Sequence, residues 1–168
     1  MQDWFMAGSH PEDYIHGIDT AIALNYEGKK VAHLRCRVDE PVNGFGTLMQ
    51  SFKADNYHNK RMCFSAVVKS EGVTKWAGLW MRIDGNDGGK SLEFDNMQER
   101  PIKGDTDWKK YQVVLDVPLK SASIHFGTLL DGKGQAWLSD VHFEEAPNEP
   151  TTGKTLPDGP ANLDFSKE

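Results

Sequence analysis

Short stretches of alternating apolar and polar residues recur along the chain, and turn-forming residues separate them. Alternation with a period of two is typical of a β-strand with one buried face, and evenly spaced strands are typical of a sandwich or barrel. Long helical patterns are scarce. The sequence therefore predicts an all-β sandwich of two antiparallel sheets, with candidate strands at residues 13–24, 29–38, 46–54, 61–70, 75–84, 91–97, 110–117, 123–130 and 135–145.

The stretch TKWAGLWMRIDG at 74–85 also fits an amphipathic helix, because apolar residues recur there at spacings of three and four. The run is short, Gly72 and the glycine-rich segment 84–89 bound it, and Gly78 lies in its middle, all of which favour a strand. We expect one face to enter the core, with Ala77, Leu79, Met81 and Ile83. The other face then carries Trp76, Gly78, Trp80, Arg82 and Asp84.

Two other candidate strands have a second face that is only mildly polar. In residues 61–70 this face includes Cys63 and Ser65, and in residues 110–117 it includes Val114. A fully solvated face would carry more charge, so we expect both faces to line a shallow concavity shared with the two tryptophans.

The length of 168 residues suits one domain with one core. We assign residues 1–145 to the sandwich and residues 146–168, rich in Pro, Gly and Thr, to a C-terminal tail. A formal net charge of −6 argues against a nucleic-acid partner, because such surfaces need clustered Lys and Arg. The sequence has no pattern of a secretory signal or a membrane span, so we expect a cytoplasmic protein with Cys36 and Cys63 as free, buried thiols.

Several motifs together resemble a known family: GDTDWKKYQVVLDVP at 104–118, the closing GQAWLSDVHFEE at 134–145, and WFMAGSHPEDYIHGID at 4–19. They are similar to the carbohydrate-binding modules with a galactose-binding-like jelly roll, and more narrowly to the jelly-roll domains attached to bacterial helix-turn-helix regulators. The resemblance implies a jelly-roll sandwich and, in some members, sugar binding. Ser139 replaces the first residue of the Asp-Asp pair of the family's closing strand, which weakens any carry-over of a structural cation site.

The opening strand of that family, Asn-x-x-Phe-Glu, is absent from the amino terminus. Residues 162–165, NLDF, have a matching pattern at the other end of the chain. Three alternatives follow: the segment docks on its own sandwich, it docks on a neighbouring copy, or it stays disordered. The chain is accordingly expected to be a monomer or a strand-swapped dimer.

A sugar site combines aromatic platforms, which stack on the apolar ring face, with planar hydrogen-bonding groups that contact the hydroxyls. The predicted ligand-binding residues are Trp76, Trp80, Arg82, Asp84, Asn96, Arg100 and Gln50. The alternative interpretation is structural: a tryptophan packs into the sandwich, and Arg82 pairs with a nearby carboxylate to cover it. We expect a non-catalytic module for a carbohydrate or another small polar ligand, with a sensory or protein-interaction domain as the alternative.

Enzymatic and metal-dependent functions are less well supported by the sequence. Glu93 and Asp95 share one strand face, which permits a glycosidase-like carboxylate pair. The turn at 84–89 echoes a calcium loop, but its flanks have the pattern of strands where that motif has helices. The histidines lack zinc-site spacing. We therefore predict no catalytic residue, no metal and no cofactor.

Overall fold

The computed structural model of the chain describes residues 1–21, 25–40, 43–153, 160 and 162–166. In these residues strands predominate, and the helical elements are the short 3-10 turns η1 (Pro11–Asp13) and η3 (Asp55–Tyr57). The strands are β1 (Phe5–Gly8), β2 (Tyr14–Asp19), β3 (Val31–Cys36), β4 (Phe45–Lys53), β5 (Arg61–Gly85), β6 (Ser91–Asp95), β7 (Ile102–Asp116), β8 (Ser121–Asp131) and β9 (Gln135–Glu145). The predicted all-β class is confirmed, although β1 was not among the predicted strands and residues 22–24 of the first predicted strand lie outside the described residues.

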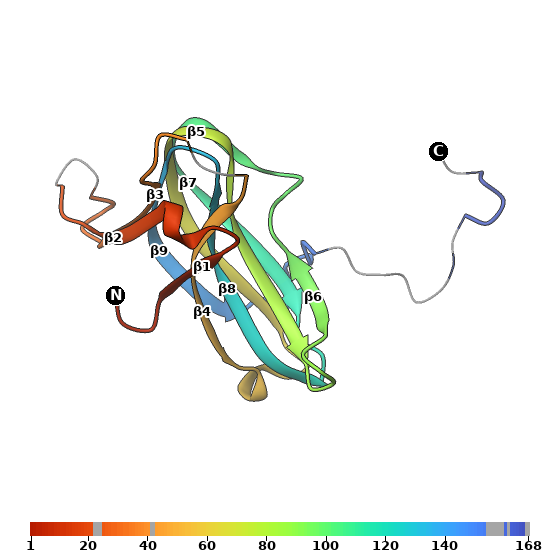
Figure 1. The fold of residues 1–168 in the computed structure, drawn as a ribbon. Coiled ribbons are helices and arrows are strands. Elements are labelled where there is room, and N and C mark those ends of the chain that lie inside the picture. The colour runs from red at the N-terminus through yellow and green to blue at the C-terminus, as the bar shows by residue number, and fades with distance from the viewer. Residues whose placement is uncertain (22–24, 41–42, 154–159, 161, 167–168) are drawn as a thin grey trace.

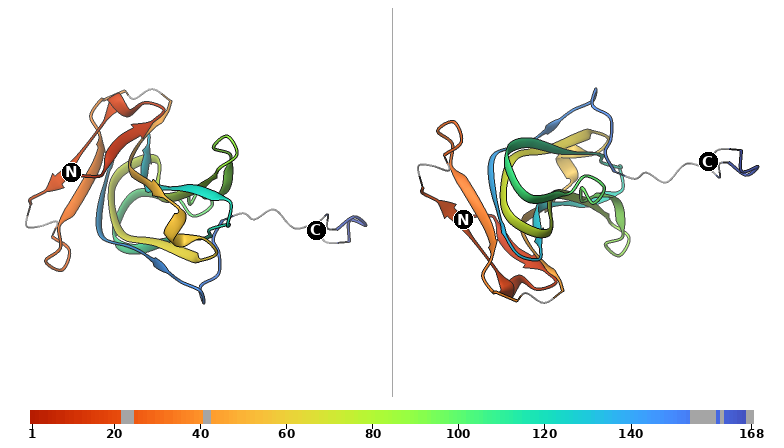
Figure 2. Two further views of the ribbon diagram at one scale, coloured as in Figure 1. Left: turned by 90° about the horizontal axis from the view of Figure 1, so that it is seen from below. Right: turned by 90° about the horizontal axis from the view of Figure 1, so that it is seen from above.

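The strands form two antiparallel layers that share the long strand β5 (Figure 1). The first layer has the order β1-β4-β8-β5-β6 and uses the second half of β5. The second layer has the order β7-β5-β9-β3-β2 and uses the first half of β5. Figure 2 looks along the strands and shows the two layers curving around a common core, with β2 and β3 extending to one side.

β5 is continuous where the sequence predicted two separate strands. Gly72 has a positive φ of 61°, which a glycine adopts without a Cβ penalty. The register against β7 shifts between Ser70 and Val73 and again before Ala77, so the chain bulges there and does not turn back. This bend carries β5 from the second layer into the first.

The core lies between the two layers and has the side chains that alternation predicted. Ala77, Leu79, Met81 and Ile83 are each 0% exposed. Facing them, Phe64 of the second layer stacks on Phe126 of the first, with ring centroids 4.2 Å apart. Burial of apolar area at about 25 cal/mol per Å² makes this the main source of stability.

The mildly polar faces do not line a concavity shared with the tryptophans, so that prediction was wrong. They belong to the second layer, whereas Trp76 and Trp80 belong to the first. The chain beyond β9 instead crosses that face: Ala146 N donates to Arg61 O at 2.8 Å, and Thr152 N donates to Val114 O at 2.9 Å. Residues up to 153 therefore pack on the sandwich, past the expected boundary at 145.

The described part of the C-terminal segment forms a turn in which Phe165 N donates to Asn162 O at 3.1 Å. Leu163 is 74% exposed and Phe165 is 86% exposed. Residues 162–166 lie away from the sandwich in Figure 1. Docking of this segment is thus not seen within the chain as the structure describes it.

Both cysteines are free thiols, Cys63 buried and Cys36 partly buried. Burial raises the pKa of the Cys63 thiol, which makes this side chain a packing group. Nowhere in the described ranges is there a helix long and apolar enough to cross a membrane.

Candidate ligand-binding groove

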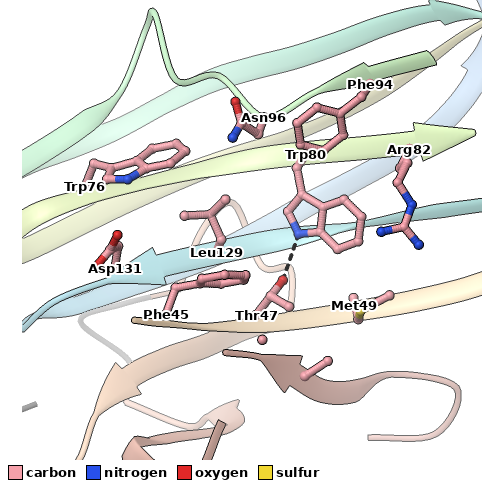
Figure 3. Close-up of a pocket in the computed structure, with 12 residues that line it drawn as sticks. Phe45, Thr47, Met49, Trp76, Trp80, Arg82, Phe94, Asn96, Leu129 and Asp131 are labelled. Atoms are coloured by element: carbon pink, nitrogen blue, oxygen red, sulfur yellow. Dashed lines mark hydrogen bonds between the residues drawn. The ribbon is translucent and has the colours of Figure 1, made fainter. Parts of the chain in front are cut away.

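A groove of about 410 Å³ lies on the outer face of the first layer, opposite the core (Figure 3). Its floor consists of Met49, Trp80 and Leu129, which come from three neighbouring strands and are 7–8% exposed. Aromatic side chains stand along its sides. The complete lining is Ala7, Gly8, Phe45, Thr47, Met49, Trp76, Trp80, Arg82, Phe94, Asn96, Leu129 and Asp131.

Trp80 is a floor residue and does not project from the sheet. It pairs in register with Gly127 of β8, where a Cβ would collide with Leu48 O and Met49 of β4. The ring crosses β8, and its Nε1 donates to Thr47 Oγ1 on β4 at 2.8 Å (Figure 3). Thr47 Oγ1 in turn donates to Thr128 O at 2.9 Å, so the indole is fixed in position.

Trp76 and Phe94 form one side of the groove and are more accessible. Trp76 is half-buried, and Phe94 is 43% exposed, the two side chains coming from β5 and β6. Gly78 makes room for Trp76, because a Cβ at this position would lie 3.3 Å from the indole atom Cζ3. Phe45 and Ala7 form the opposite side.

Arg82 lies at one end of the groove and is held by Asp84. Its Nε donates to Asp84 Oδ1 at 2.9 Å and its Nη2 to Oδ2 at 3.1 Å. Within the described chain Nη1 makes no hydrogen bond, so its two N–H groups remain for a ligand.

A polar chain supports this ion pair from behind. His125 Nε2 lies 3.1 Å from Asp84 Oδ2, and His125 Nδ1 lies 2.7 Å from Ser51 Oγ. Burial lowers the pKa of His125, and the carboxylate of Asp84 opposes that shift in part. At neutral pH the neutral imidazole therefore bridges Ser51 and Asp84 and fixes the carboxylate that holds Arg82.

Asp131 provides a carboxylate at the other end, and Asn96 lies between the two ends, beside Gly78 (Figure 3). Asp131 Oδ1 is buried and accepts no hydrogen bond from the described residues, Lys75 Nζ is 3.8 Å away, and the Asp131 side chain as a whole is 26% exposed. Asn96 Oδ1 accepts from Gln98 N at 3.1 Å, which leaves its amide NH₂ as a donor. Acceptors and donors thus flank an apolar floor.

Of the predicted site residues, Trp76, Trp80, Arg82 and Asn96 line the groove, and Asp84 acts through Arg82. Gln50 was wrongly placed there. On β4 the side chains of Phe45, Thr47 and Met49 point into the groove. Gln50 is offset from them by an odd number of residues, so it points to the opposite face, beside Phe52 and Phe126.

Arg100 was also wrongly placed in the site. Its Nη2 donates to Asp95 Oδ2 at 2.6 Å and to Gln112 O at 3.2 Å, so it joins the segment after β6 to β7. Asp95 pairs with Met81 of the core face, which puts this pair on the side of the sheet away from the groove. Conversely, sequence reasoning missed Phe45, Thr47, Met49, Phe94, Leu129 and Asp131.

A carboxylate pair suited to glycoside hydrolysis does not form in the groove. Glu93 and Asp95 point to the same face of β6, as predicted. They pair with Ile83 and Met81, which face the core, so both carboxylates lie on the side away from the groove. The carboxylates on the groove face are those of Asp131 and Asp84. Asp131 lies on β8, and Asp84 lies on β5 opposite Ser123, which is eight residues from Asp131 along β8. That separation is about 26 Å, whereas glycosidases need about 5–10 Å. The described residues also contain no cluster of three or more His, Cys, Asp or Glu suited to a metal.

Solved structures of carbohydrate-binding modules have the same fold as this chain. The chain aligns with the C-terminal family 22 carbohydrate-binding module of Clostridium thermocellum Xyn10B at a TM-score of 0.58 and 12% identity, over 89% of this chain and 90% of the module. The chain has the fold of the carbohydrate-binding modules. A CBM61 module, TmCBM61, solved with β-1,4-galactotriose, aligns at a TM-score of 0.55 and 12% identity, over 86% of this chain and 90% of that one. The xylan-binding CBM22-1 domain of Paenibacillus barcinonensis Xyn10C aligns at 0.56 and 16%, over 88% of each chain.

At the level of sequence, no family model matches the chain. An uncharacterized HTH-type transcriptional regulator of Bacillus subtilis (strain 168), YbfP, is 42% identical over the whole of this chain. The chain spans 58% of the length of that relative.

Proposed function

We propose that this chain is a non-catalytic module that binds a carbohydrate in the groove on its first layer. The observation that carries the proposal is the composition of the groove: a fixed apolar floor around Trp80, accessible aromatic rings at Trp76 and Phe94, and polar side chains in the lining at both ends. A sugar has the matching chemistry, since its ring face is apolar and its edge carries hydroxyls.

In the proposed mode a sugar ring lies over the floor against Trp76. The exposed part of the Asp131 carboxylate accepts a hydrogen bond from a hydroxyl, while Arg82 Nη1 and the amide of Asn96 donate to hydroxyl oxygens. The groups at the two ends are far enough apart to contact different rings, which favours an oligosaccharide over a monosaccharide. Because each polar contact replaces one with water, most of the affinity comes from apolar area and stays modest.

The fold comparison supports this choice of ligand class, because modules of this architecture include one solved with β-1,4-galactotriose. The proposal includes no hydrolysis, and the wide separation of Asp131 and Asp84 along the sheet supports this choice.

A second candidate function is favoured by the relative that is an HTH-type regulator. In that case the groove belongs to a sensory domain in the cytoplasm, and ligand occupancy changes the state of a regulator. The same ligand chemistry serves both candidates, so binding is the step to test first.

The test is a titration of intrinsic tryptophan fluorescence with a panel of neutral β-1,4-linked oligosaccharides and short peptides. The proposal predicts a saturable change with at least one sugar, because Trp76 and Trp80 lie at the site. A response to peptides and to no sugar would reject the carbohydrate and favour a protein-interaction role.

A further inference from the structure

One side of the sandwich has two unpaired strand edges that face each other. β1 pairs with β4 only as far as Met49, and β3 pairs with β9 only as far as Leu138. No described strand pairs with residues 50–53 or 139–145 on that side. Free edges of this kind readily accept another strand.

The opening between these edges exposes part of the aromatic core. Phe52 of β4 and Phe143 of β9 meet there with ring centroids 5.3 Å apart, and Tyr57 packs on Phe143 at 5.1 Å. All three side chains are only partly buried, although they belong to the main core cluster.

Two hollows follow this opening, separate from the ligand groove. One, of about 380 Å³, lies between Phe52, Tyr57 and Phe143. The other, of about 200 Å³, lies between Leu48 and Val141. The sandwich thus lacks one covering element along this side.

The C-terminal segment 162–165 has the properties of that element. In the sequence NLDF, Leu163 and Phe165 alternate with Asn162 and Asp164, so an extended backbone would place both apolar side chains on one face. At present these are among the most exposed large apolar side chains of the described chain, at 74% and 86%. Two apolar side chains in water and an opening that exposes apolar core could cover each other.

The path of the tail indicates which sandwich receives the segment. Thr152 bonds to Val114 of β7, and a Cβ at Gly153 would touch Leu115 and the backbone of Phe94. The tail therefore leaves at the β6–β7 side, and the strand order puts the open edges of β4 and β9 at the opposite side. Figure 1 shows residues 162–166 well clear of their own sandwich.

We infer that residues 162–165 add a strand to the β9 edge of a second copy of this chain, with Leu163 and Phe165 over Phe52, Tyr57 and Phe143 of that copy. The exchange is reciprocal, so it closes as a two-fold symmetric dimer. Residues 154–161 supply the link between the two copies, and eight extended residues reach about 27 Å.

The experiment combines light scattering after size exclusion with hydrogen exchange on the full chain. Strand exchange between two copies predicts a species of twice the 18.8 kDa chain mass. It also predicts slow hydrogen exchange at those amides of residues 141–145 that do not bond to β5. The double variant Leu163→Ser, Phe165→Ser should be monomeric and lose that protection. The control Leu119→Ser, which removes a 67% exposed apolar side chain outside the tail, should remain dimeric.

A synthetic peptide of residues 160–168 gives a second measurement on the double variant. It should restore protection at 141–145, and a peptide carrying both serines should not. If the wild type is a monomer and the same amides of residues 141–145 are protected from hydrogen exchange, the segment docks on its own chain, and the proposed strand exchange between copies is wrong. A dimer that survives in the double variant, or unprotected edges in the wild type, would overturn it as well.

Discussion

Truncation of Trp76 should remove ligand affinity at a modest cost in stability. The side chain forms one side of the groove and is half-buried, so Trp76→Ala deletes a stacking surface and leaves the floor around Trp80 in place. A sugar face that buries about 50–100 Å² of apolar area against an indole gains about 1.3–2.5 kcal/mol. This corresponds to a loss of about 10- to 70-fold in affinity.

The cost in stability follows from the burial of the same side chain. Full burial of a Trp makes truncation cost about 3–5 kcal/mol, and a half-buried one should cost about half of that. The variant should therefore stay folded. Its dissociation constant is measured by calorimetric titration with the tightest sugar of the panel, after urea unfolding has shown a cooperative transition.

The matched control is Trp108→Ala. Trp108 is also partly exposed, but it lies on β7 of the second layer and packs on Tyr26, with ring centroids 5.3 Å apart. Affinity should be unchanged in this variant. If both variants bind as wild type does, or both lose affinity equally, the groove is not the site and the reasoning fails.

Further predictions concern stability, the polar ends and pH. Leu79→Ala, at a core position with 0% exposure, should lower the free energy of unfolding by about 2–5 kcal/mol in urea titrations; a change below about 1 kcal/mol would contradict the core assignment. Asp131→Asn should weaken sugar binding about 3- to 10-fold, because a charged acceptor is worth about 1 kcal/mol more than a neutral one, whereas Asp107→Asn on β7 should leave binding unchanged in the same calorimetric assay. Burial lowers the pKa of His125 and of His33, so acidification through about pH 6.5 should destabilise the fold, since the unfolded chain takes up protons that the native state does not. Urea midpoints at pH 7.5 and 5.5 measure this loss, which should shrink in His125→Gln; a midpoint that rises on acidification would contradict it.

Local alternation was enough to predict the fold class and the two faces of residues 75–84. Leu79 and Ile83 entered the core as expected, because a strand that is buried on one face allows only one parity there. The boundary at Gly72 could not be predicted in the same way. Glycine permits both a reversal and a bulge, and only pairing with β7 and β8 selects the bulge.

The candidate site was harder to predict because it depends on register between distant strands. Alternation in 46–54 separates Gln50 from Thr47 and Met49, but only pairing with β8 shows which set shares a face with Trp80. The position of Trp80 follows from the pairing of β5 with β8, where its partner is Gly127, a residue 47 positions along the chain. The ion pair between Arg100 and Asp95 could not be predicted, because alternation does not show how the chain turns after residue 95.

Mapping of ligand contacts by ¹H–¹⁵N NMR shows directly whether the groove binds a carbohydrate. A neutral β-1,4-linked oligosaccharide is titrated into the full chain, and the indole and backbone N–H signals are followed. Carbohydrate binding in the groove should give saturable shifts at Trp76, Trp80 and Asn96, with the Trp108 indole on the second layer unchanged. Shifts confined to the second layer, or none for any sugar at millimolar concentration, would contradict carbohydrate binding in this groove.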